Sequence, residues 1–353
     1  MSLDLTLDTV QLAEDLVNIE SVSGNEAVIA SAVEDALREF AHLRVERFGH
    51  TVVARTDLGR AERVVIAGHL DTVPLNANLP ARRDDRYLHG LGACDMKAGC
   101  AVALKLATLP TPNRDLTFLF YECEEVETER NGLNLLAQSR PDLLEADFAI
   151  LMEPSDGVVE AGCQGTLRVD VHTRGERAHS ARSWTGVNAI HAAADLLARL
   201  KAYQPRRPVI DGLEYREGLN AVFISGGGAG NVLPDRCTVS VNYRFAPDRS
   251  EAEALAHVHE VFAGFDVEVS DSAPAAMPGL TVPAAAAFVQ AVGGTVNPKF
   301  GWTDVARFSA LGVPAVNFGP GDPHLAHKQE EHVPLEQIRS VEAQLRTWLG
   351  EPS

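Results

Sequence analysis

The sequence contains few cysteines and few basic residues, and each shortage excludes a class of protein. Its five cysteines are scattered and form no CxxC pair, which argues against a disulfide framework and against a thiolate zinc site. Lysine and arginine number 31 against 49 aspartates and glutamates, so the net charge is -18. Such a surface repels phosphate backbones and anionic lipid, and we therefore expect neither a nucleic-acid partner nor a membrane partner.

Long apolar runs are also missing. No stretch approaches the ~20 uninterrupted apolar residues that a membrane-spanning helix requires. Residues 1–16 carry acidic side chains where a signal peptide needs a basic segment followed by an apolar run. We therefore expect a cytoplasmic protein without an export signal. The 45% hydrophobic content over 353 residues is typical of a large globular domain, alone or with a smaller insert.

The spacing of apolar residues changes twice along the chain. Up to about residue 160, helical periodicity alternates with short apolar runs, and this pattern returns near the C-terminal end. Such alternation predicts an α/β fold with a largely buried sheet flanked by helices. The order in between, strand, helix, strand, strand, helix, strand, is that of the split βαββαβ motif of ferredoxin-like domains. We predict a larger domain formed by residues 1–165 and 273–353 and an inserted domain formed by residues 166–272.

Acidic and histidine side chains follow four of the predicted strands of the larger domain. The strands are residues 63–68, 116–122, 147–152 and 313–319, and the side chains after them are, in the same order, His69 and Asp71, Glu124 and Glu125, Glu153, and His327. In open α/β sheets, ligands bind beyond the carboxyl ends of the strands. Asp95 joins this set from the glycine-rich segment HGLGACDMKAG, just before a predicted helix.

Carboxylates that crowd one edge of a sheet repel one another and raise their own pKa values unless a cation neutralises them. A single HxD segment or Glu-Glu pair is common on a solvated surface, but Glu124 and Glu125 follow a very apolar strand. Histidine with carboxylates and without thiolate suits zinc, with cobalt or manganese as possible substitutes. The combination predicts a metal site. Cys94 and Cys123 lie beside the presumed ligands without the spacing of a thiolate pair, and we interpret them as small buried side chains.

The order of the motifs resembles that of a known family, the dinuclear-zinc metallopeptidases and deacylases, which include succinyl-diaminopimelate desuccinylases, acetylornithine deacetylases and glutamate carboxypeptidases. The resemblance covers nearly the whole chain and rests on the segments GHLDTVP, GACDMKAG, the Glu-Glu pair, MEPS, GNVLP, NYRF, TDVARF and LAHKQE. It implies a zinc-peptidase-like catalytic domain that holds two zinc ions per chain, and an insert that serves as lid and dimerisation domain. One departure is Cys123, where related desuccinylases usually have aspartate.

The resemblance also implies roles for the metal ligands. Asp95 would bridge the two metals, and the other ligands would be His69 and Glu153 at one metal, and Glu125 and His327 at the other. Asp71 would hydrogen-bond the ring of His69 and fix its tautomer. Because Glu125 is assigned to metal, Glu124 is free to deprotonate the attacking water and then to protonate the leaving amine.

Further residues are assigned to the oxyanion and to the substrate by the same resemblance. His179 of the insert would donate a hydrogen bond to the oxyanion, and it would reach the active site of the partner chain in a homodimer. Its alternative is an ordinary histidine of the inserted domain. The substrate contacts would be Asn231, Arg244, Thr303 and Arg307. The two arginines suit bidentate pairing with a carboxylate, and their alternative is an exposed surface ion pair.

The expected reaction is metal-dependent hydrolysis of the amide bond of a small N-acyl amino acid that carries carboxylate groups. The segments SARSWTGVNAIH and GPGDPHLAHKQ look closest to desuccinylases of bacterial lysine and cell-wall synthesis. An acetylornithine deacetylase, an aminoacylase or a dipeptidase built on the same site is the alternative within the family. A catalytically dead homologue that acts as a binding protein would require a missing ligand or base, and none is missing here.

Overall fold

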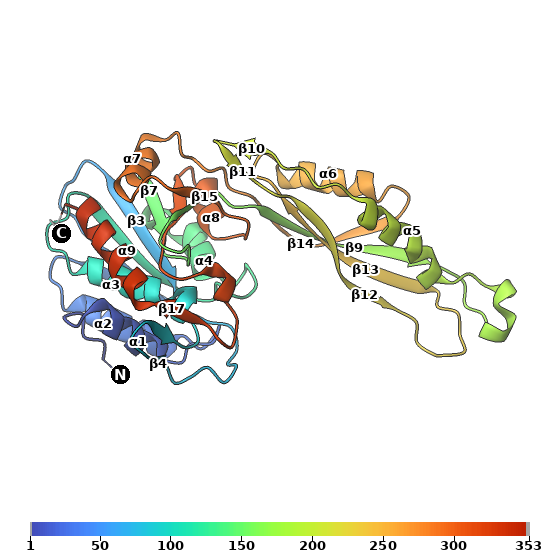
Figure 1. Cartoon of the computed structure of the whole chain (residues 1–353), viewed down its shortest axis with the longest axis horizontal. Coiled ribbons are helices and arrows are strands. Elements are labelled where there is room, and N and C mark those ends of the chain that lie inside the picture. The colour runs from blue at the N-terminus through green and yellow to red at the C-terminus, as the bar shows by residue number, and fades with distance from the viewer. Residues whose placement is uncertain (1, 351–353) are drawn as a thin grey trace. The chain divides into compact units, whose positions relative to one another are not determined.

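The computed structural model describes residues 2–350 and divides the chain into two compact units (Figure 1). Unit 1 consists of Met1–Ala161, Gly279–Asn297 and Arg307–Ser353, and unit 2 consists of Gly162–Pro278 and Pro298–Ala306. Residues 162–165, 273–278 and 298–306 were predicted in the larger domain, whereas all three segments group with unit 2. The reason is their hydrogen bonding, because Cys163 pairs with Ala276 and the backbone N–H of Gln164 donates to the Lys299 carbonyl at 3.3 Å.

A mixed eight-stranded sheet forms the centre of unit 1, in the order β1-β2-β6-β3-β7-β16-β8-β15. The strands β6, β3, β7 and β16 are parallel neighbours, and the strands on either side of them run antiparallel. The bounds are β1 (Arg44–Phe48), β2 (Thr51–Arg55), β3 (Arg63–His69), β6 (Asp115–Tyr121), β7 (Phe148–Leu151), β8 (Val159–Ala161), β15 (Val296–Pro298) and β16 (Ala315–Asn317). The predicted α/β fold, with a sheet flanked by helices, is thus confirmed, and the sheet is mixed.

Helix α3 (Ala98–Ala107) is the buried helix that connects this sheet with the outer helices. Nine of its ten residues are buried, as is typical of a helix that is surrounded by other elements. It packs on β3 and β6 and also contacts α1 and α9, and its first residue directly follows the short helix η1, which carries Asp95. The helices are α1 (Thr9–Val17), α2 (Ala27–Arg38), η1 (Ala93–Lys97), α3, α4 (Gly132–Ser139), η2 (Pro141–Leu143), α7 (Pro283–Ala291), α8 (Val305–Ala310), η4 (Pro323–Leu325) and α9 (Leu335–Trp348).

A second, smaller sheet of unit 1 has the order β17-β5-β4, with β4 (Arg82–Arg83), β5 (Tyr87–His89) and β17 (His332–Pro334). Strand β5 leads into the loop before η1, and β17 leads into α9. This small antiparallel sheet therefore connects the segment that carries Asp95 with the segment that carries His327.

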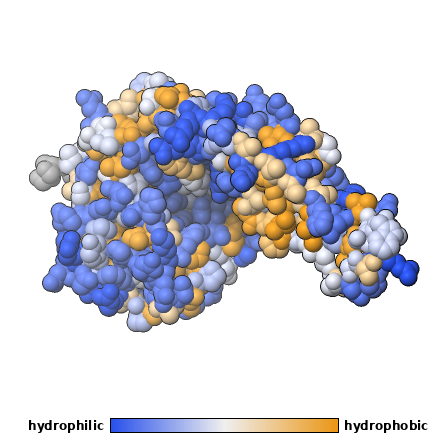
Figure 2. Space-filling view, turned by 45° about the vertical axis from the view of Figure 1, so that its right-hand side comes forward, coloured by the Kyte–Doolittle hydropathy of each residue, from blue (hydrophilic) through white to orange (hydrophobic). Residues whose placement is uncertain are grey.

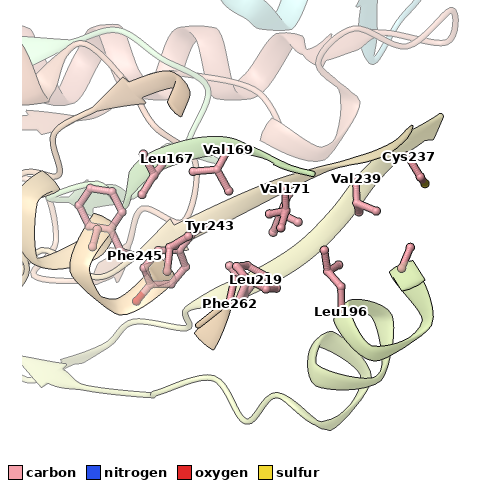
Figure 3. Close-up of a cluster of buried hydrophobic side chains, with 14 of the residues drawn as sticks. Leu167, Val169, Val171, Leu196, Leu219, Cys237, Val239, Tyr243, Phe245 and Phe262 are labelled. Atoms are coloured by element: carbon pink, nitrogen blue, oxygen red, sulfur yellow. The ribbon is translucent and has the colours of Figure 1, made fainter. Parts of the chain in front are cut away.

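Unit 2 is built around an antiparallel sheet of four strands in the order β12-β13-β9-β14. Alternate side chains of β13 are buried, as expected for a sheet with one covered face. The covered face packs against α5 and α6 through Leu167, Val171, Val239, Leu196 and Phe262 (Figure 3). The bounds are β9 (Gly165–Arg174), η3 (Ser180–Thr185), α5 (Ala189–Ala202), β10 (Val209–Ile210), β11 (Leu213–Glu214), β12 (Gly218–Gly226), β13 (Arg236–Phe245), α6 (Glu251–Val261) and β14 (Asp266–Ala273).

The longer elements of unit 2 follow the chain order strand, helix, strand, strand, helix, strand, as the sequence pattern predicts. Across residues 2–350, none of the helices combines the length and the apolar character that crossing a membrane demands.

Candidate active site

The predicted ligands are brought to one edge of the large sheet by its parallel strands. Because β6, β3, β7 and β16 are parallel neighbours, their carboxyl ends meet at the same edge. His69 ends β3, and the other strands lead into the segments that carry Glu124 and Glu125, Glu153, and His327. Apolar strands thus deliver polar side chains to one edge of the sheet, where Asp95 and Glu125 lie against histidines.

Asp95 lies at the centre of the cluster, with one carboxylate oxygen toward each of two histidines. Its Oδ1 is 3.1 Å from His69 Nε2, and its Oδ2 is 3.5 Å from His327 Nε2. His327 Nε2 is also 2.9 Å from Glu125 Oε1. Ligand atoms of His69, Asp95 and Glu125 all lie within 4.8 Å of one another. This arrangement suits a carboxylate that bridges two cations, each with its own histidine.

The two histidines and Asp95 shift one another's pKa values. Burial opposes the charged form of His69, but the hydrogen bond to Asp95 and the charge of Asp71 outweigh it and raise the pKa of His69 well above its ordinary value. Hydrogen bonds to Asp95 and Glu125 raise the pKa of His327 to about 10. Burial raises the pKa of Asp95, yet the two histidines lower it overall. Positive charge therefore stabilises the carboxylates of this cluster, and bound divalent cations would supply it.

The loop before Asp95 is held by a residue that the sequence analysis missed, Glu331. Its Oε1 accepts the backbone N–H groups of Cys94 and Asp95 at 2.8 and 3.0 Å, and its Oε2 accepts that of Gly92 at 3.0 Å. Burial raises the pKa of Glu331 to about 7. The nearby charge of Asp95 acts in the same direction, and the three backbone hydrogen bonds act against it. Glu331 follows Glu330, which is exposed, and nothing in the pattern tells which of the two is buried.

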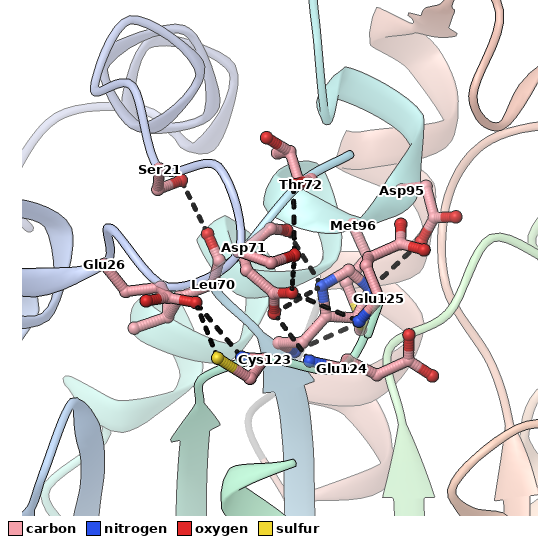
Figure 4. A network of polar contacts seen from close by, with 12 residues as sticks. Ser21, Glu26, Leu70, Asp71, Thr72, Asp95, Met96, Cys123, Glu124 and Glu125 are labelled. Carbon is pink, nitrogen blue, oxygen red and sulfur yellow. Dashed lines mark hydrogen bonds and ion pairs between the residues drawn. The ribbon is translucent and has the colours of Figure 1, made fainter. Parts of the chain in front are cut away.

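Asp71 holds the Glu124-Glu125 segment rather than the ring of His69. Its Oδ1 accepts the backbone N–H of Glu124 at 3.0 Å, and its Oδ2 accepts that of Glu125 at 3.1 Å and the hydroxyl of Ser23 at 2.7 Å (Figure 4). His69 Nδ1 donates to the backbone carbonyl of Asp71 at 3.0 Å, whereas the Asp71 carboxylate is 3.6 Å away. The tautomer of His69 is thus set by a backbone carbonyl, and its Nε2 faces Asp95.

Cys123 changes the hydrogen bonding beside Glu124 without removing a ligand. The backbone N–H and the thiol of Cys123 both donate to Oε1 of the buried Glu26, at 3.2 and 3.3 Å. Burial and the charge of Glu26 raise the pKa of the thiol to about 12. Cys123 is therefore a protonated donor at neutral pH, consistent with a structural side chain.

Glu124, Glu153 and Arg307 complete the predicted residues of unit 1. Glu124 is half-buried, and its charge is one of those that raise the pKa of His69. Glu153 is 6% exposed and follows β7 directly. The backbone of Gly99 packs closely against the residue before Glu153. A Cβ added to Gly99 would lie only 2.1 Å from the carbonyl oxygen of Met152. Arg307 of α8 donates to Asn134 of α4 at 3.1 Å, and α4 follows the Glu124-Glu125 segment.

Unit 2 contains the other predicted residues, and it brings His179 and Asn231 onto adjacent segments. His179 pairs with Val232, and the N–H of Ser180 donates to the Asn231 carbonyl at 2.9 Å. His179 is exposed, and its Nδ1 accepts the N–H of Ala181 at 3.1 Å. In the neutral ring the proton therefore lies on Nε2, which is free to donate.

Arg244 and Thr303 lie elsewhere in unit 2. Arg244 Nε donates to Asn242 Oδ1 at 3.1 Å, and burial, with the nearby charge of Arg168, lowers the pKa of Arg244. The Thr303 hydroxyl is buried and has no hydrogen-bond partner within residues 2–350. A buried hydroxyl without a partner is costly.

Together, the fold and the histidine-carboxylate cluster define a metal-dependent hydrolase. The sequence profile of peptidase family M20/M25/M40 matches residues 65–349, and the chain belongs to this family.

Two relatives match over nearly their whole length. A protein of Mycobacterium tuberculosis named putative succinyl-diaminopimelate desuccinylase is 55% identical over 352 residues, which is 99% of each chain. Succinyl-diaminopimelate desuccinylase of Corynebacterium glutamicum is 48% identical, over 99% of this chain and 98% of that one. Among solved structures, a Bacillus subtilis protein described as a dinuclear metal-binding peptidase of the M20 family shares the fold, with a TM-score of 0.67 and 15% identity over 96% and 95% of the two chains.

Proposed function

We propose that the chain hydrolyses the amide bond of N-succinyl-L,L-diaminopimelate to succinate and L,L-diaminopimelate. The observation that carries the chemistry is the half-buried Asp95, which presents one oxygen to His69 and the other to His327. The relatives from M. tuberculosis and C. glutamicum, 55% and 48% identical over nearly the whole chain, support this substrate. The product would be a precursor of lysine and of the cell wall.

The residues of unit 1 fit a pair of zinc ions. Asp95 would bridge them, with His69 and Glu153 at one ion and Glu125 and His327 at the other. Histidine and carboxylate donors suit zinc, and cobalt or manganese could substitute. The B. subtilis fold neighbour is described as binding a dinuclear metal centre, which supports the same count here. When bound, two zinc ions polarise a carbonyl and lower the pKa of water toward ~7.

Protons are moved by Glu124. Its backbone N–H is held by Asp71 at 3.0 Å, and this hydrogen bond positions the segment that carries the Glu124 carboxylate beside the cluster. Glu124 would take the proton of the attacking water and then deliver it to the leaving amine, so that one residue serves as base and acid in turn. His179 would donate its Nε2–H to the oxyanion that develops on the substrate carbonyl.

The substrate carboxylates would be recognised by arginine. The guanidinium group pairs with a carboxylate through two parallel hydrogen bonds, and Arg244 and Arg307 are the arginines assigned to this role. Asn231 and Thr303 would add polar contacts, and the unpartnered buried hydroxyl of Thr303 supports this assignment. A substrate with several carboxylates explains why a very acidic protein places arginine in these segments.

We further propose a homodimer that forms through unit 2, with His179 reaching the active site of the partner. Strand β12 is one of the two edge strands of its sheet, and Phe223 at 63% and Val222 at 59% exposure lie on it. Figure 2 shows hydrophobic side chains gathered on the surface of this unit. An apolar edge strand favours pairing with a second copy, because its backbone groups lack partners. We place the reaction in the cytoplasm, consistent with free cysteines at all five positions.

The proposal is tested by assaying one zinc-loaded preparation against a panel of substrates. The panel comprises N-succinyl-L,L-diaminopimelate, N-acetylornithine, other acylated amino acids and dipeptides. We expect kcat/KM to be highest for N-succinyl-L,L-diaminopimelate. A higher value for N-acetylornithine, an acylated amino acid or a dipeptide would transfer the assignment to that reaction of the same site. No hydrolysis of any member by fully metal-loaded protein would indicate a binding protein instead.

A further inference from the structure

Two histidines face each other across the small sheet of unit 1. His89 of β5 lies directly opposite His332 of β17. The adjacent pair is hydrogen-bonded, because the N–H of Gly90 donates to the Glu331 carbonyl at 3.2 Å. Hydrogen-bonded and non-hydrogen-bonded pairs alternate along an antiparallel ladder, so His89 and His332 form a non-hydrogen-bonded pair, in which side chains come closest. Their ring centroids are 5.2 Å apart, and the rings are tilted by 41°.

Hydrogen bonds fix which nitrogen of each ring carries the proton. His89 Nε2 is 3.0 Å from Asp84 Oδ2, and hydrogen bonds from the backbone of Arg86 and from His89 lower the pKa of Asp84 to about 2. A carboxylate only accepts, so His89 Nε2 is the donor. His332 Nδ1 donates to the Glu330 carbonyl at 2.7 Å for the same reason.

The other nitrogen of each neutral ring has a free lone pair. Within residues 2–350, neither His89 Nδ1 nor His332 Nε2 has a hydrogen-bond partner. We propose that His89 and His332 bind one divalent transition-metal ion of the zinc class, at a site separate from the centre at Asp95. Zn–N distances of about 2.0–2.1 Å and a tetrahedral angle place the centroids of two bound rings about 5 Å apart. The observed separation agrees with this value.

The surroundings of the pair match those of metal-binding histidines. Such histidines donate their second N–H to a carboxylate or a backbone carbonyl, as His89 does to Asp84 and His332 to Glu330. The pair opens onto a surface depression of ≈ 500 Å³ that is also lined by Asn78, Gln329 and Glu330, and this depression leaves room for water to complete the coordination of a bound ion. Arg82 lines the same depression, but its charge is offset by Asp84 at 3.7 Å.

A bound ion would connect β5 to β17 next to the loop of Asp95. The ladder continues from His89 and His332 into Gly90 and Glu331, and the Glu331 carboxylate holds the N–H of Asp95 at 3.0 Å. The ion therefore stabilises a connection on which the metal centre depends, although it does not contact the substrate.

The first test is crystallographic. Crystals of the wild-type chain are soaked in zinc chloride, and an anomalous difference map is calculated at the zinc edge. We expect a peak between His89 Nδ1 and His332 Nε2, separate from the peaks around Asp95. A fully occupied centre at Asp95 without a peak at the histidine pair would overturn the proposal.

The second test measures stoichiometry in solution. Zinc-loaded wild type, His89→Gln, His332→Gln and the control His259→Gln are equilibrated with the same free zinc, and bound zinc is counted. His259 is an exposed histidine of α6 with no part in the pair. We expect His89→Gln and His332→Gln each to bind one zinc fewer than wild type and His259→Gln to bind the same number. Equal counts in all four proteins would contradict the site.

A third variant tests the proton arrangement without removing a ligand. The Oδ1 of Asp84 accepts the backbone N–H groups of Arg86 and Tyr87, both at 2.9 Å. In Asp84→Asn these donors keep the amide oxygen at the Oδ1 position. The amide NH₂ then faces His89 Nε2 and moves the ring proton to Nδ1. We expect zinc affinity at the pair to fall by about 10–100-fold, with hydrolytic turnover unchanged. Unaltered affinity would refute the role of His89 Nδ1 as a ligand.

Discussion

Replacing Asp71 by asparagine tests how Glu124 is positioned. The carboxylate accepts the N–H groups of Glu124 and Glu125 and the hydroxyl of Ser23, at 3.0, 3.1 and 2.7 Å. Asparagine keeps one oxygen, so at least one of these hydrogen bonds is lost and an NH₂ group then faces a half-buried N–H. A hydrogen bond to a charged group contributes about 1.5–3 kcal/mol, and an unsatisfied buried donor costs about 1–3 kcal/mol.

We therefore expect Asp71→Asn to lower the free energy of unfolding by about 2–5 kcal/mol. Because displacement of a catalytic group by about 1 Å costs about 10²-fold in rate, we expect kcat to fall by at least that factor while bound metal is retained. Urea unfolding, metal analysis and steady-state kinetics on one preparation measure the three quantities.

Asp115 supplies a matched control at the other end of β6. Its carboxylate accepts the hydroxyl of Thr56 at 3.0 Å and the N–H groups of Leu58 and Arg60 at 2.7 and 2.8 Å. Asp115→Asn should therefore lose similar stability and leave kcat unchanged. Wild-type kcat in Asp71→Asn, or an equal loss of kcat in Asp115→Asn, would refute positioning of Glu124 by Asp71.

Three further changes separate the roles of the other residues. Glu124→Ala should lose turnover by several orders of magnitude and keep its metal, whereas Glu125→Ala should lose metal. Near-normal turnover in metal-loaded Glu124→Ala would refute the assignment of Glu124 as the base. Changing Arg244 or Arg307 to methionine should weaken productive binding of the substrate by about 2–5 kcal/mol if the arginine forms a desolvated charge pair with a substrate carboxylate. The loss would be measured as a fall in kcat/KM. Unchanged kinetics for both variants would reject the two arginines as substrate contacts. Mixing inactive Glu124→Ala and His179→Ala chains under subunit exchange should restore activity, since one site of each heterodimer then has both groups; verified exchange without recovery would argue against His179 acting across the dimer.

The architecture and the location of the cluster could be predicted from the sequence. Apolar runs such as residues 63–68 and 147–152 end directly at His69 and before Glu153, and parallel strands bring such ends together. The order of helices and strands in unit 2 was predicted for a similar reason, because the period of its apolar residues switches cleanly between helix and strand.

The hydrogen bonds around the site could not be predicted in the same way. Periodicity locates Asp71 but does not show that its side chain accepts from the backbone of a loop more than fifty residues later, at Glu124 and Glu125. Glu331 is buried by the tertiary fold alone, because it follows an exposed glutamate in a polar segment. Residues 298–306 group with unit 2 through tertiary contacts, such as those of Lys299 with Gln164 and of Thr303 with Cys163, which leave no pattern in the sequence.

Zinc titration into metal-free protein, with succinate release from N-succinyl-L,L-diaminopimelate followed at each step, tests the central claim most directly. We expect no release without metal, a rise that stops once two equivalents occupy the centre at Asp95, and no release at any zinc concentration in Asp95→Ala. Further equivalents bound at His89 and His332 should add no activity. Full activity of protein shown to be free of metal, or wild-type release by Asp95→Ala, would contradict the account.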